Sequence, residues 1–483
     1  MERPSVAEHR TSPLPWLDAE GLRNLSRRLD AGLRRARAAG APVIVSVTAP
    51  LGKMLDPVGV AAASRRRGEP WFCLEQPDRE GSALAALGSV RALEAKGSDR
   101  FVAVAARWRA LAASALAGPC EDPPGSGLVA VGGFGFAPEA GGAPCWEGFA
   151  PASLIVPELS LARRSERASL TLNVQAAPDD TLEDLVGRAE GRLGELRAAP
   201  LPLLDPAAVG SYQVRSSMPP AHYEEAVAQA VQRIRRGELE KIVVAREVQI
   251  EAPVDYDPGA VLGVLRDAFP SCYVFAVGRG QSTFIGASPE LLVRREGQRA
   301  STVALAGSSR RSADPAVDDH LGERLLRSEK DREENAIVVR RIARALERQA
   351  VWVTAAPEPV LVRIANIQHL ATPIRAQLAQ PVGAIELVGA LHPTPAVGGE
   401  PRDVAVGLIP ALEGLDRGWY AGPIGWSDAS GDGEFCVALR CALLLERRAH
   451  LYAGCGIVRD SDPAAELAES EVKLEALLPL LAG

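Results

Sequence analysis

The last helix that the sequence predicts carries two carboxylates and one ammonium group on a single face. An Asp-Pro pair at 462–463 is typical of a helix N-cap followed by proline in the first turn. Glu466, Glu469 and Lys473 follow at spacings that place all three on one helical face, just after a Gly-Cys-Gly turn at 454–456. This arrangement suits a metal ion together with an anionic ligand. A solvated helix face with intrahelical ion pairs is the alternative.

A second pair of carboxylates, Asp331 and Glu334, lies three residues apart in the motif SEKDREEN. Two facing helices that each contribute carboxylates would form an all-oxygen site, which suits Mg²⁺. In such a site Mg²⁺ keeps several waters or accepts a carboxylate of the substrate. The same motif would also occur in a charge-rich, exposed turn of helix, and the residues alone leave that alternative open.

Lysine is rare in this chain. The 54 basic residues include only five lysines, namely Lys53, Lys96, Lys241, Lys330 and Lys473. Because arginine keeps its proton in proteins whereas a buried lysine can lose it, a retained lysine can mark a position where arginine would not serve. Lys241 opens the apolar strand KIVVAREVQI, where loss of hydration makes the amine a candidate base. A lysine at the edge of a sheet is the alternative.

Glu290 is a candidate acid. It follows Pro289 in the otherwise apolar segment GASPELLV, and burial raises the pKa of a carboxyl group. A charge at the end of a strand is the alternative. A base and an acid on opposite sides of one small molecule are what the addition of water at one carbon and the loss of hydroxide at another require.

The composition limits the classes of protein to which these residues can belong. A chain of 483 residues that is 47% hydrophobic can bury a large core. Its net charge of −7 argues against a nucleic-acid or anionic-membrane surface, and it has no apolar run long enough for a membrane span. The N-terminus lacks the apolar core of a signal peptide, and the seven scattered cysteines form no Cys-x-x-Cys pair. We therefore expect a cytoplasmic protein without nucleic-acid or membrane partners.

Two regions follow from the pattern along the chain. Residues 1–210 end in a connector rich in proline and alanine, and residues 215–480 carry the candidate chemistry. The glycine-rich segment 127–138 lacks the G-x-G-x-x-G spacing, and Pro138 stands where a helix would begin. This segment therefore predicts a hairpin or closely packed strands rather than a dinucleotide-binding loop.

The elements that must position the candidate residues come in mixed order. The pattern predicts a helix after Pro219-Pro220, strands over 241–250, 273–278 and 282–296, and one long charged helix over 314–349. Several of the strands form hairpin-like pairs. The sequence therefore predicts an α+β fold with largely antiparallel sheets rather than a doubly wound one.

Residues 217–478 resemble the chorismate-utilising enzymes, through a series of motifs that occur in order. The motifs are EKIVVAR, IGASPELLV, ALAGS, SEKDREEN, IQHLATPI, LHPTPAVGG, DRGWYAGPIGW, ALRCALL, AGCGIV and ELAESEVK. This family includes isochorismate synthases, salicylate synthases and the first components of anthranilate synthase and aminodeoxychorismate synthase. The resemblance implies layered, mostly antiparallel sheets flanked by helices. It also implies that residues 1–210 form a variable N-terminal region that completes the fold.

The resemblance implies a role for each candidate residue. Lys241 matches the general base that activates water at C2 of chorismate, and Glu290 matches the general acid that protonates the departing C4 hydroxyl. Glu334 and Glu469 match the direct Mg²⁺ ligands, whereas Asp331 and Glu466 match outer carboxylates that hold metal-bound waters. The residues that match groups gripping the substrate carboxylates are Tyr420, Arg440, Gly454, Gly456 and Lys473. Those that match other substrate-binding positions of the pocket are Gly307, Ser308, His369 and Thr394.

The segment ALAGS, residues 304–308, separates the branches of the family. Aminodeoxychorismate synthases carry a nucleophilic lysine where this chain has Ala306. Anthranilate synthases usually have proline at the start of the segment, lack the lysine base and take ammonia from a glutaminase subunit. Lys241 together with this segment therefore favours water as nucleophile, which implies an isochorismate synthase without a glutaminase subunit. Because no assembly segment stands out in the sequence, we expect a monomer. A salicylate synthase, which would go on to eliminate pyruvate, and a non-catalytic chorismate- or metal-binding homologue stay open as alternatives.

Overall fold

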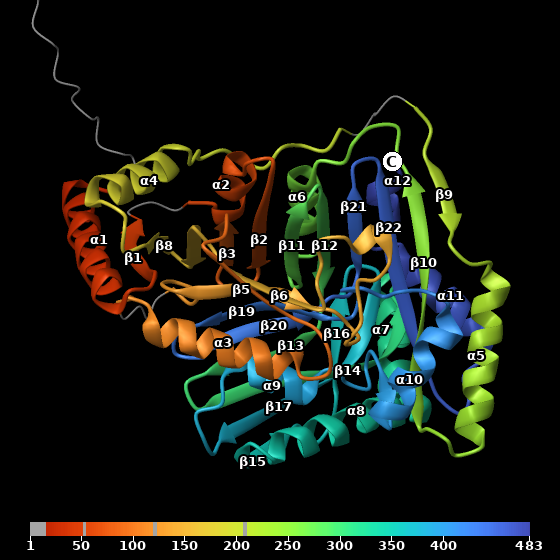
Figure 1. The fold of residues 1–483 in the computed structure, drawn as a ribbon. Helices are drawn as coiled ribbons and strands as arrows, with labels where there is room; N and C mark the ends of the chain where they lie inside the picture. The colour runs from red at the N-terminus through yellow and green to blue at the C-terminus, as the bar shows by residue number, and fades with distance from the viewer. Residues whose placement is uncertain (1–15, 52–54, 119–122, 206–209) are drawn as a thin grey trace, which may run out of the picture.

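The computed structural model describes residues 16–51, 55–118, 123–205 and 210–483, and it builds them around two large sheets (Figure 1). The named strand pairs of the described residues are antiparallel in both sheets, as the two hairpin-rich regions of the sequence require. The predicted α+β fold class, with layered antiparallel sheets and flanking helices, is confirmed. The two sheets meet in a shared apolar interior, and most helices lie on their outer faces.

The first sheet has twelve strands and contains strands from both predicted regions. Its path begins with strands from residues 1–210, passes through the hairpin β11–β12 and ends at β18, whose neighbour β10 also pairs with β22 and β9. In path order the strands are β1 (Val43–Leu51), β8 (Arg167–Ala176), β7 (Leu159–Arg164), β3 (Ser82–Leu87), β2 (Gly68–Gln76), β11 (Tyr273–Gly280), β12 (Ser282–Ser288), β21 (Cys441–Leu445), β22 (Arg448–Ile457), β10 (Lys241–Glu251) and β18 (Gly399–Glu400), with β9 (Gln213–Ser216) beside β10.

The second sheet has ten strands and is mixed in the same way. Strand β19 of the second region pairs with β5 of the first, so that the N-terminal strands continue the sheet. In path order the strands are β15 (Ala350–Ala355), β17 (Ile367–Leu378), β14 (Arg299–Arg310), β13 (Leu291–Glu296), β20 (Gly433–Val437), β19 (Pro423–Asp428), β5 (Val129–Phe134), β6 (Ala152–Val156) and β4 (Arg91–Ala95), with β16 (Val360–Ile364) beside β17.

The helices cover the sheets in separate groups (Figure 1). Helices α1 (Ala19–Ala39), α2 (Pro57–Ser64), α4 (Leu182–Gly194) and α6 (Pro258–Ala268) pack on the first sheet. Helices α3 (Arg100–Ser114), α7 (Pro315–Arg327), α8 (Glu329–Glu347) and α9 (Ala384–Leu391) pack on the second. Helices α5 (Pro220–Arg235), α10 (Arg402–Glu413) and α11 (Pro463–Leu474) gather around β10 and β22, and α12 (Leu478–Ala482) ends the chain.

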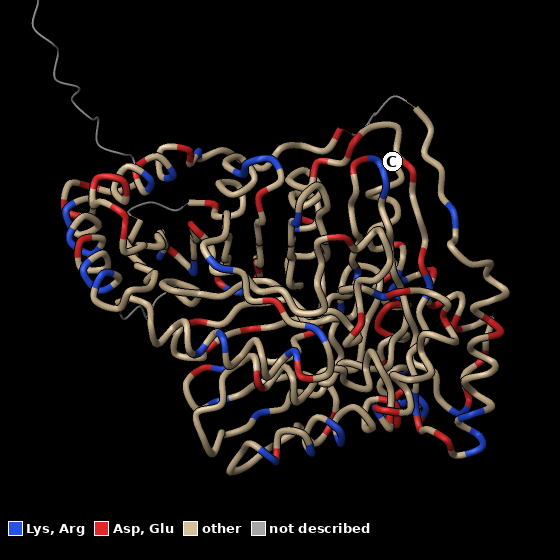
Figure 2. Tube along the Cα trace, in the orientation of Figure 1, with Lys and Arg blue, Asp and Glu red and all other residues tan. Residues whose placement is uncertain are grey.

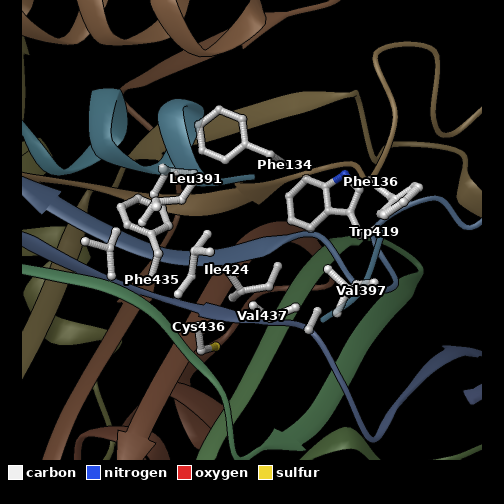
Figure 3. Close-up of a cluster of buried hydrophobic side chains, with 14 of the residues drawn as sticks. Phe134, Phe136, Leu391, Val397, Trp419, Ile424, Phe435, Cys436 and Val437 are labelled. Atoms are coloured by element: carbon white, nitrogen blue, oxygen red, sulfur yellow. The ribbon is translucent and has the colours of Figure 1, made fainter. Parts of the chain in front are cut away.

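The interior is aromatic and aliphatic where β5, β19 and β20 meet α9. Figure 3 shows Phe134 of β5 beside Phe435 of β20, with Ile424 of β19 and Leu391 of α9 close by. The rings of Phe134 and Phe435 are tilted against each other with centroids 6.2 Å apart. Val397 belongs to the same cluster. Burial of these side chains is the main favourable term that holds the N-terminal strands against the rest of the chain.

Two predicted elements were wrong in extent. The single charged helix expected over 314–349 is two helices, α7 and α8, because Ser328 has extended backbone angles and its side chain caps α8 by accepting the N–H of Asp331. The strand expected over 282–296 is also two elements. Strand β12 belongs to the first sheet and β13 to the second, with Pro289 and Glu290 in the link between them. Proline lacks an N–H group for the ladder, which explains the break.

Charges of both signs are interspersed along the chain in the view of Figure 2, including over α1 and α4. None of the helices in the described part of the chain is long and apolar enough to cross a membrane.

Candidate active site

A cavity lies where the ends of β14, β17 and β22 meet helices α8 and α11. Its lining includes Glu334 of α8, Glu469 and Lys473 of α11, and Glu290, Leu439 and Arg440. The remaining wall is contributed by Val243, Pro289, Leu305, Ala306, Gly307, Ser308, His369, Ala396, Val397, Tyr420, Tyr452, Ala453, Gly454 and Gly456. The structure thus brings most of the residues singled out in the sequence to one place, although they come from segments far apart in the chain.

Three of the four candidate metal carboxylates each contact a lysine. The Nζ atom of Lys241 lies 2.8 Å from Oε1 of Glu334, and that of Lys473 lies 2.8 Å from Oε1 of Glu469. Lys330 donates to Oε1 of Glu466 at 3.1 Å. Together with Asp331, these six residues form what we call the lysine–carboxylate cluster. Of the other two lysines, Lys96 is exposed after β4 and Lys53 lies outside the described residues.

The two helices that carry the carboxylates begin at well-capped N-termini. The Oδ1 atom of Asp462 accepts the N–H of Ala465 at 2.9 Å, so α11 begins where the Asp-Pro pair predicts. One turn on, Glu466 is only 3% exposed. A solvated helix face, the alternative for this segment, does not describe a carboxylate with so little access to water.

Burial sets the protonation tendencies in the cluster. It raises the pKa of Glu466, which the nearby carboxylate of Glu469 raises further, and it also raises the pKa of Asp331. Burial acts in the same direction on Glu469, but Lys473 and the hydroxyl of Ser308 outweigh it and hold the pKa of Glu469 below its ordinary value. Four carboxylates face three ammonium groups, so the cluster has room for further positive charge.

The donor set fits a hard divalent cation. Glu334 and Glu469 line the cavity, whereas Asp331 and Glu466 do not. Carboxylate oxygens are the ligands that Mg²⁺ prefers. Cys455, which the sequence analysis did not single out, lies with ligand atoms of Glu466 and Glu469 within 4.8 Å of one another. Burial raises the pKa of the Cys455 thiol, so it stays protonated and the available donors are oxygens.

The glycines of β22 make space for these charges. Gly454 and Gly456 pair with Ala245 and Val243 of β10. A Cβ atom on Gly456 would lie 2.3 Å from Oε1 of Glu334 and 2.8 Å from Cε of Lys241. A side chain at this position would therefore push the carboxylate and the lysine apart.

The sequence predicted that Glu290 lies within a strand over 282–296. In the structure it lies in the link between the two sheets instead. Its N–H donates to Oγ of Ser288 at 3.2 Å, and its carbonyl accepts the N–H of Val437 at 3.0 Å. Burial raises the pKa of its carboxyl group to about 8, although the charge of Lys241 offsets part of the rise. Glu290 is therefore mostly protonated at neutral pH and can donate a proton into the cavity.

The residues predicted to bind the carboxylates of the substrate also line the cavity. Nη2 of Arg440 lies 2.8 Å from Nε2 of His369, and Nη1 of Arg440 has no hydrogen-bond partner among the described residues. Burial and the charge of Arg440 hold the pKa of His369 well below its ordinary value, so the ring is neutral and its Nε2 accepts. Tyr420 stacks on Tyr452 with centroids 5.3 Å apart. The Arg440 guanidinium thus keeps donors free for an anion.

Some predicted residues stand back from the cavity. Lys241 is completely buried behind Glu334, and Thr394 is 2% exposed while Ala396 and Val397 of the same loop form the wall. The sequence analysis gave no role to Lys330 or Tyr452. The rarity of lysine could have indicated a functional role for Lys330. Tyr452 is an aromatic residue in an apolar strand, and such a residue gives no indication of a role.

The Chorismate binding enzyme family matches residues 31–482. The chain belongs to this family, and the resemblance drawn from its motif series is confirmed.

Full-length relatives narrow the comparison. The chain is 38% identical over 462 residues to the salicylate biosynthesis isochorismate synthase of Pseudomonas aeruginosa, covering 96% of this chain and 95% of the relative. It is 32% identical over 460 residues to the isochorismate synthase MenF of Bacillus subtilis, covering 93% and 96%. The structure of MenF, the menaquinone-specific isochorismate synthase of Escherichia coli, matches with a TM-score of 0.77 at 27% identity, covering 95% of this chain and all of the other. These relatives are isochorismate synthases, the branch of the family that the segment ALAGS favours.

Proposed function

We propose that this chain is an isochorismate synthase, which converts chorismate reversibly into isochorismate with Mg²⁺ as its cofactor. The observation that carries the proposal is a single cavity lined both by Glu290, whose carboxylic acid is mostly protonated at neutral pH, and by the carboxylates of Glu334 and Glu469, which suit a hard divalent cation. Lys241 is fully buried and forms an ion pair with Glu334, with 2.8 Å between Nζ and Oε1. The names of the full-length relatives support the same activity.

Four carboxylates would hold the metal. Glu334 and Glu469 face the cavity and would bind it directly, while Asp331 and Glu466 would hold its waters. When bound, Mg²⁺ supplies positive charge for a carboxylate of the substrate. Lys473, beside Glu469, and Arg440, which also lines the cavity, would hold the substrate's carboxylates in place.

The chain's own residues would carry the two proton transfers. Lys241, in the form that has given up its own proton, would act as the base that takes a proton from the attacking water while the oxygen of that water bonds to C2. The ring double bonds shift and the bond from C4 to its hydroxyl breaks, while Glu290 gives its proton to the leaving oxygen, which departs as water. The atoms balance, because one water enters and one leaves. Ala306 offers no amine at the position where another branch has a nucleophilic lysine, which leaves water as the nucleophile.

The test is incubation of the purified protein with chorismate and Mg²⁺, with products separated by chromatography over time. We expect isochorismate to approach an equilibrium with chorismate, and EDTA to stop the reaction. Accumulation of salicylate and pyruvate would assign the chain to the lyase branch. Absence of turnover in the presence of Mg²⁺ would overturn the proposal in favour of a binding protein. We expect activity from the monomer without a glutaminase subunit, which gel filtration of the active fraction checks.

A matched pair of variants links the activity to the cavity. Glu290→Gln should lose about 10²- to 10⁴-fold in kcat and keep its affinity for chorismate, because the amide fills the same space but lacks the acidic proton. Glu75 is another buried glutamate whose pKa burial raises, but it contacts Arg266 outside the cavity. Glu75→Gln should therefore keep the kcat of the wild type, and equal losses in both variants would count against Glu290 as the acid.

A further inference from the structure

Asn335 follows Glu334 directly on α8 and is buried, with 3% of its surface exposed. Its Nδ2 atom lies 3.3 Å from the carbonyl oxygens of Ala304 and Ala306 and 3.2 Å from that of Leu370. Its Oδ1 atom accepts the hydroxyl of Thr372 at 2.7 Å. One amide side chain therefore connects the metal-site helix to two neighbouring strands.

The two strands that Asn335 joins are out of regular register at this point. Leu305 of β14 pairs with Ala371 of β17, but Ser308 pairs with His369, so Ala306 and Gly307 together oppose Leu370 alone. Such a bulge leaves part of the ladder without its regular hydrogen bonds. Asn335 supplies a donor to Ala306 and Leu370 on the two sides of the bulge, where an unmet buried carbonyl would be costly.

The bulge carries several groups of the active site. Ser308 donates from Oγ to Oε1 of Glu469 at 2.7 Å. Gly307 has a φ of +81°, and a Cβ atom there would lie 2.9 Å from Cβ of Asp331. On the facing strand, His369 contacts Arg440. The shape of the bulge thus determines where these groups stand relative to Glu334.

We propose that Asn335, held by Thr372, is a positioning residue that locks the β14–β17 bulge onto α8 and so sets the distance between Glu334 and Glu469. Asn335 does not line the cavity, so it acts through its neighbours and touches no reacting atom. The inference rests on the proposed function for its effect on catalysis, but the order of the bulge can be measured without substrate or metal.

Two variants and one control test this role. Asn335→Ala removes the whole bridge. Thr372→Val removes only the hydroxyl that orients Asn335, and it is the milder change if Asn335→Ala folds poorly. Asn173 of β8 is the control. It is a buried asparagine that donates to the carbonyl of Pro157 at 2.8 Å, and it does not line the cavity. Asn173→Ala should lower the melting temperature without reaching the active site.

Three readouts separate positioning from stability. For Asn335→Ala we expect Mg²⁺ binding, measured by calorimetry with the metal alone, and kcat to fall about 10- to 100-fold, as for other residues that orient metal ligands. Thr372→Val should show smaller losses of the same kind, and Asn173→Ala should match the wild type. In hydrogen exchange of the free protein, peptides covering 303–310 should exchange faster in Asn335→Ala and Thr372→Val than in Asn173→Ala.

The outcomes distinguish the two proposals. If the wild type is active and the variants Asn335→Ala and Asn173→Ala have the same Mg²⁺ affinity and the same kcat, the positioning role is overturned. A wild type without turnover of chorismate would count against the proposed function. In that case the hydrogen exchange still decides, because unchanged protection of 303–310 in Asn335→Ala would overturn the lock itself and faster exchange would support it.

Discussion

Two buried groups of charges join the layers of this molecule, and they are built from different cations. The lysine–carboxylate cluster lines and backs the candidate active site. The second group, which we call the arginine cluster, consists of Arg79, Tyr273, Arg294 and Glu434. Nη1 of Arg79 lies 3.0 and 2.9 Å from the two oxygens of Glu434, Tyr273 donates to Oε1 of the same carboxylate at 2.7 Å, and Arg294 donates to it as well.

The difference lies in how completely each carboxylate is satisfied. In the arginine cluster two guanidinium groups and a hydroxyl surround one carboxylate. Burial would raise the pKa of Glu434, but Arg294 and Arg79 outweigh it and hold that pKa below its ordinary value. In the lysine–carboxylate cluster each of three carboxylates has one ammonium contact, and the pKa values of Glu466 and Asp331 are raised. Arginine forks fix a geometry, whereas ammonium groups are single point charges that another cation can replace.

The largest expected effect comes from placing arginine in the wrong cluster. Lys241→Arg keeps the positive charge beside Glu334 but cannot give up a proton, so kcat should fall about 10²- to 10⁴-fold. The reverse change, Arg294→Lys, should leave kcat unchanged and cost stability only. Steady-state kinetics with Mg²⁺ in excess checks both. Equal kcat values for Lys241→Arg and the wild type would end the distinction between the clusters.

Removing the shared carboxylate tests the structural side of the comparison. Glu434→Ala removes the carboxylate that Arg79 and Arg294 share, which leaves Arg79 with the exposed Glu296 at 3.6 Å and Arg294 with the hydroxyl of Tyr273 at 3.1 Å. Breaking a buried ion pair costs about 3 to 5 kcal/mol, and the remaining contacts place the expected loss at the lower end of that range. Denaturant unfolding should show this loss, while the kcat of the folded fraction remains that of the wild type. A change in KM for chorismate would show that the arginine cluster also contributes to the site.

The pH dependence of activity, which Glu290 in the cavity should set, is expected to differ from the pH dependence that Glu434 of the arginine cluster gives to stability. Glu290 must be protonated to act as an acid, and its pKa is raised to about 8 by burial. We therefore expect kcat to decline as the pH rises through about 8, by about tenfold per pH unit beyond it. Glu434 has a lowered pKa, so its contribution to stability is present above its ordinary pKa and is lost only as the pH falls through the lowered value. Rate profiles between pH 6 and 10 check the expectation for Glu290, and unfolding curves from neutral pH down through the ordinary glutamate pKa of 4.5 check that for Glu434.

The smallest effect is expected at the exposed edge of the lysine–carboxylate cluster. The side chain of Lys330 is 40% exposed, so solvent screens its contact with Glu466. Lys330→Met removes one positive charge that competes with the metal. The Mg²⁺ concentration for half-maximal activity should therefore fall about two- to fivefold. A higher Mg²⁺ requirement would mean that Lys330 supports the site rather than competes for it.

The residue types of the site were predictable from the sequence, but their pairing was not. Helix periodicity placed Glu466, Glu469 and Lys473 together, since that information is local. The contact between Lys330 and Glu466 depends on how α8 and α11 pack, which no local pattern encodes. Likewise, Ser328 ends one helix and caps the next, but the continuous charge pattern of 314–349 gave no sign of this break. The bulge at Ala306 and Gly307 arises only when β14 and β17 pair. Antiparallel class and helix starts follow from short-range rules, whereas register between distant strands follows from packing.

The interleaving of early and late strands has a consequence for biosynthesis. Strand β2 pairs with β11, and β5 pairs with β19. The edge of β5 that contains Gly133 therefore stays unpaired until β19, which contains Ile424, has been synthesised. When the first region has left the ribosome, its strands β2 and β5 therefore each have an unpaired edge. Such edges can pair with other chains until the second region has been synthesised. We therefore expect the sheets to be completed only after β11 and β19 have been synthesised. We expect nascent chains halted before β19 to depend on chaperones for solubility.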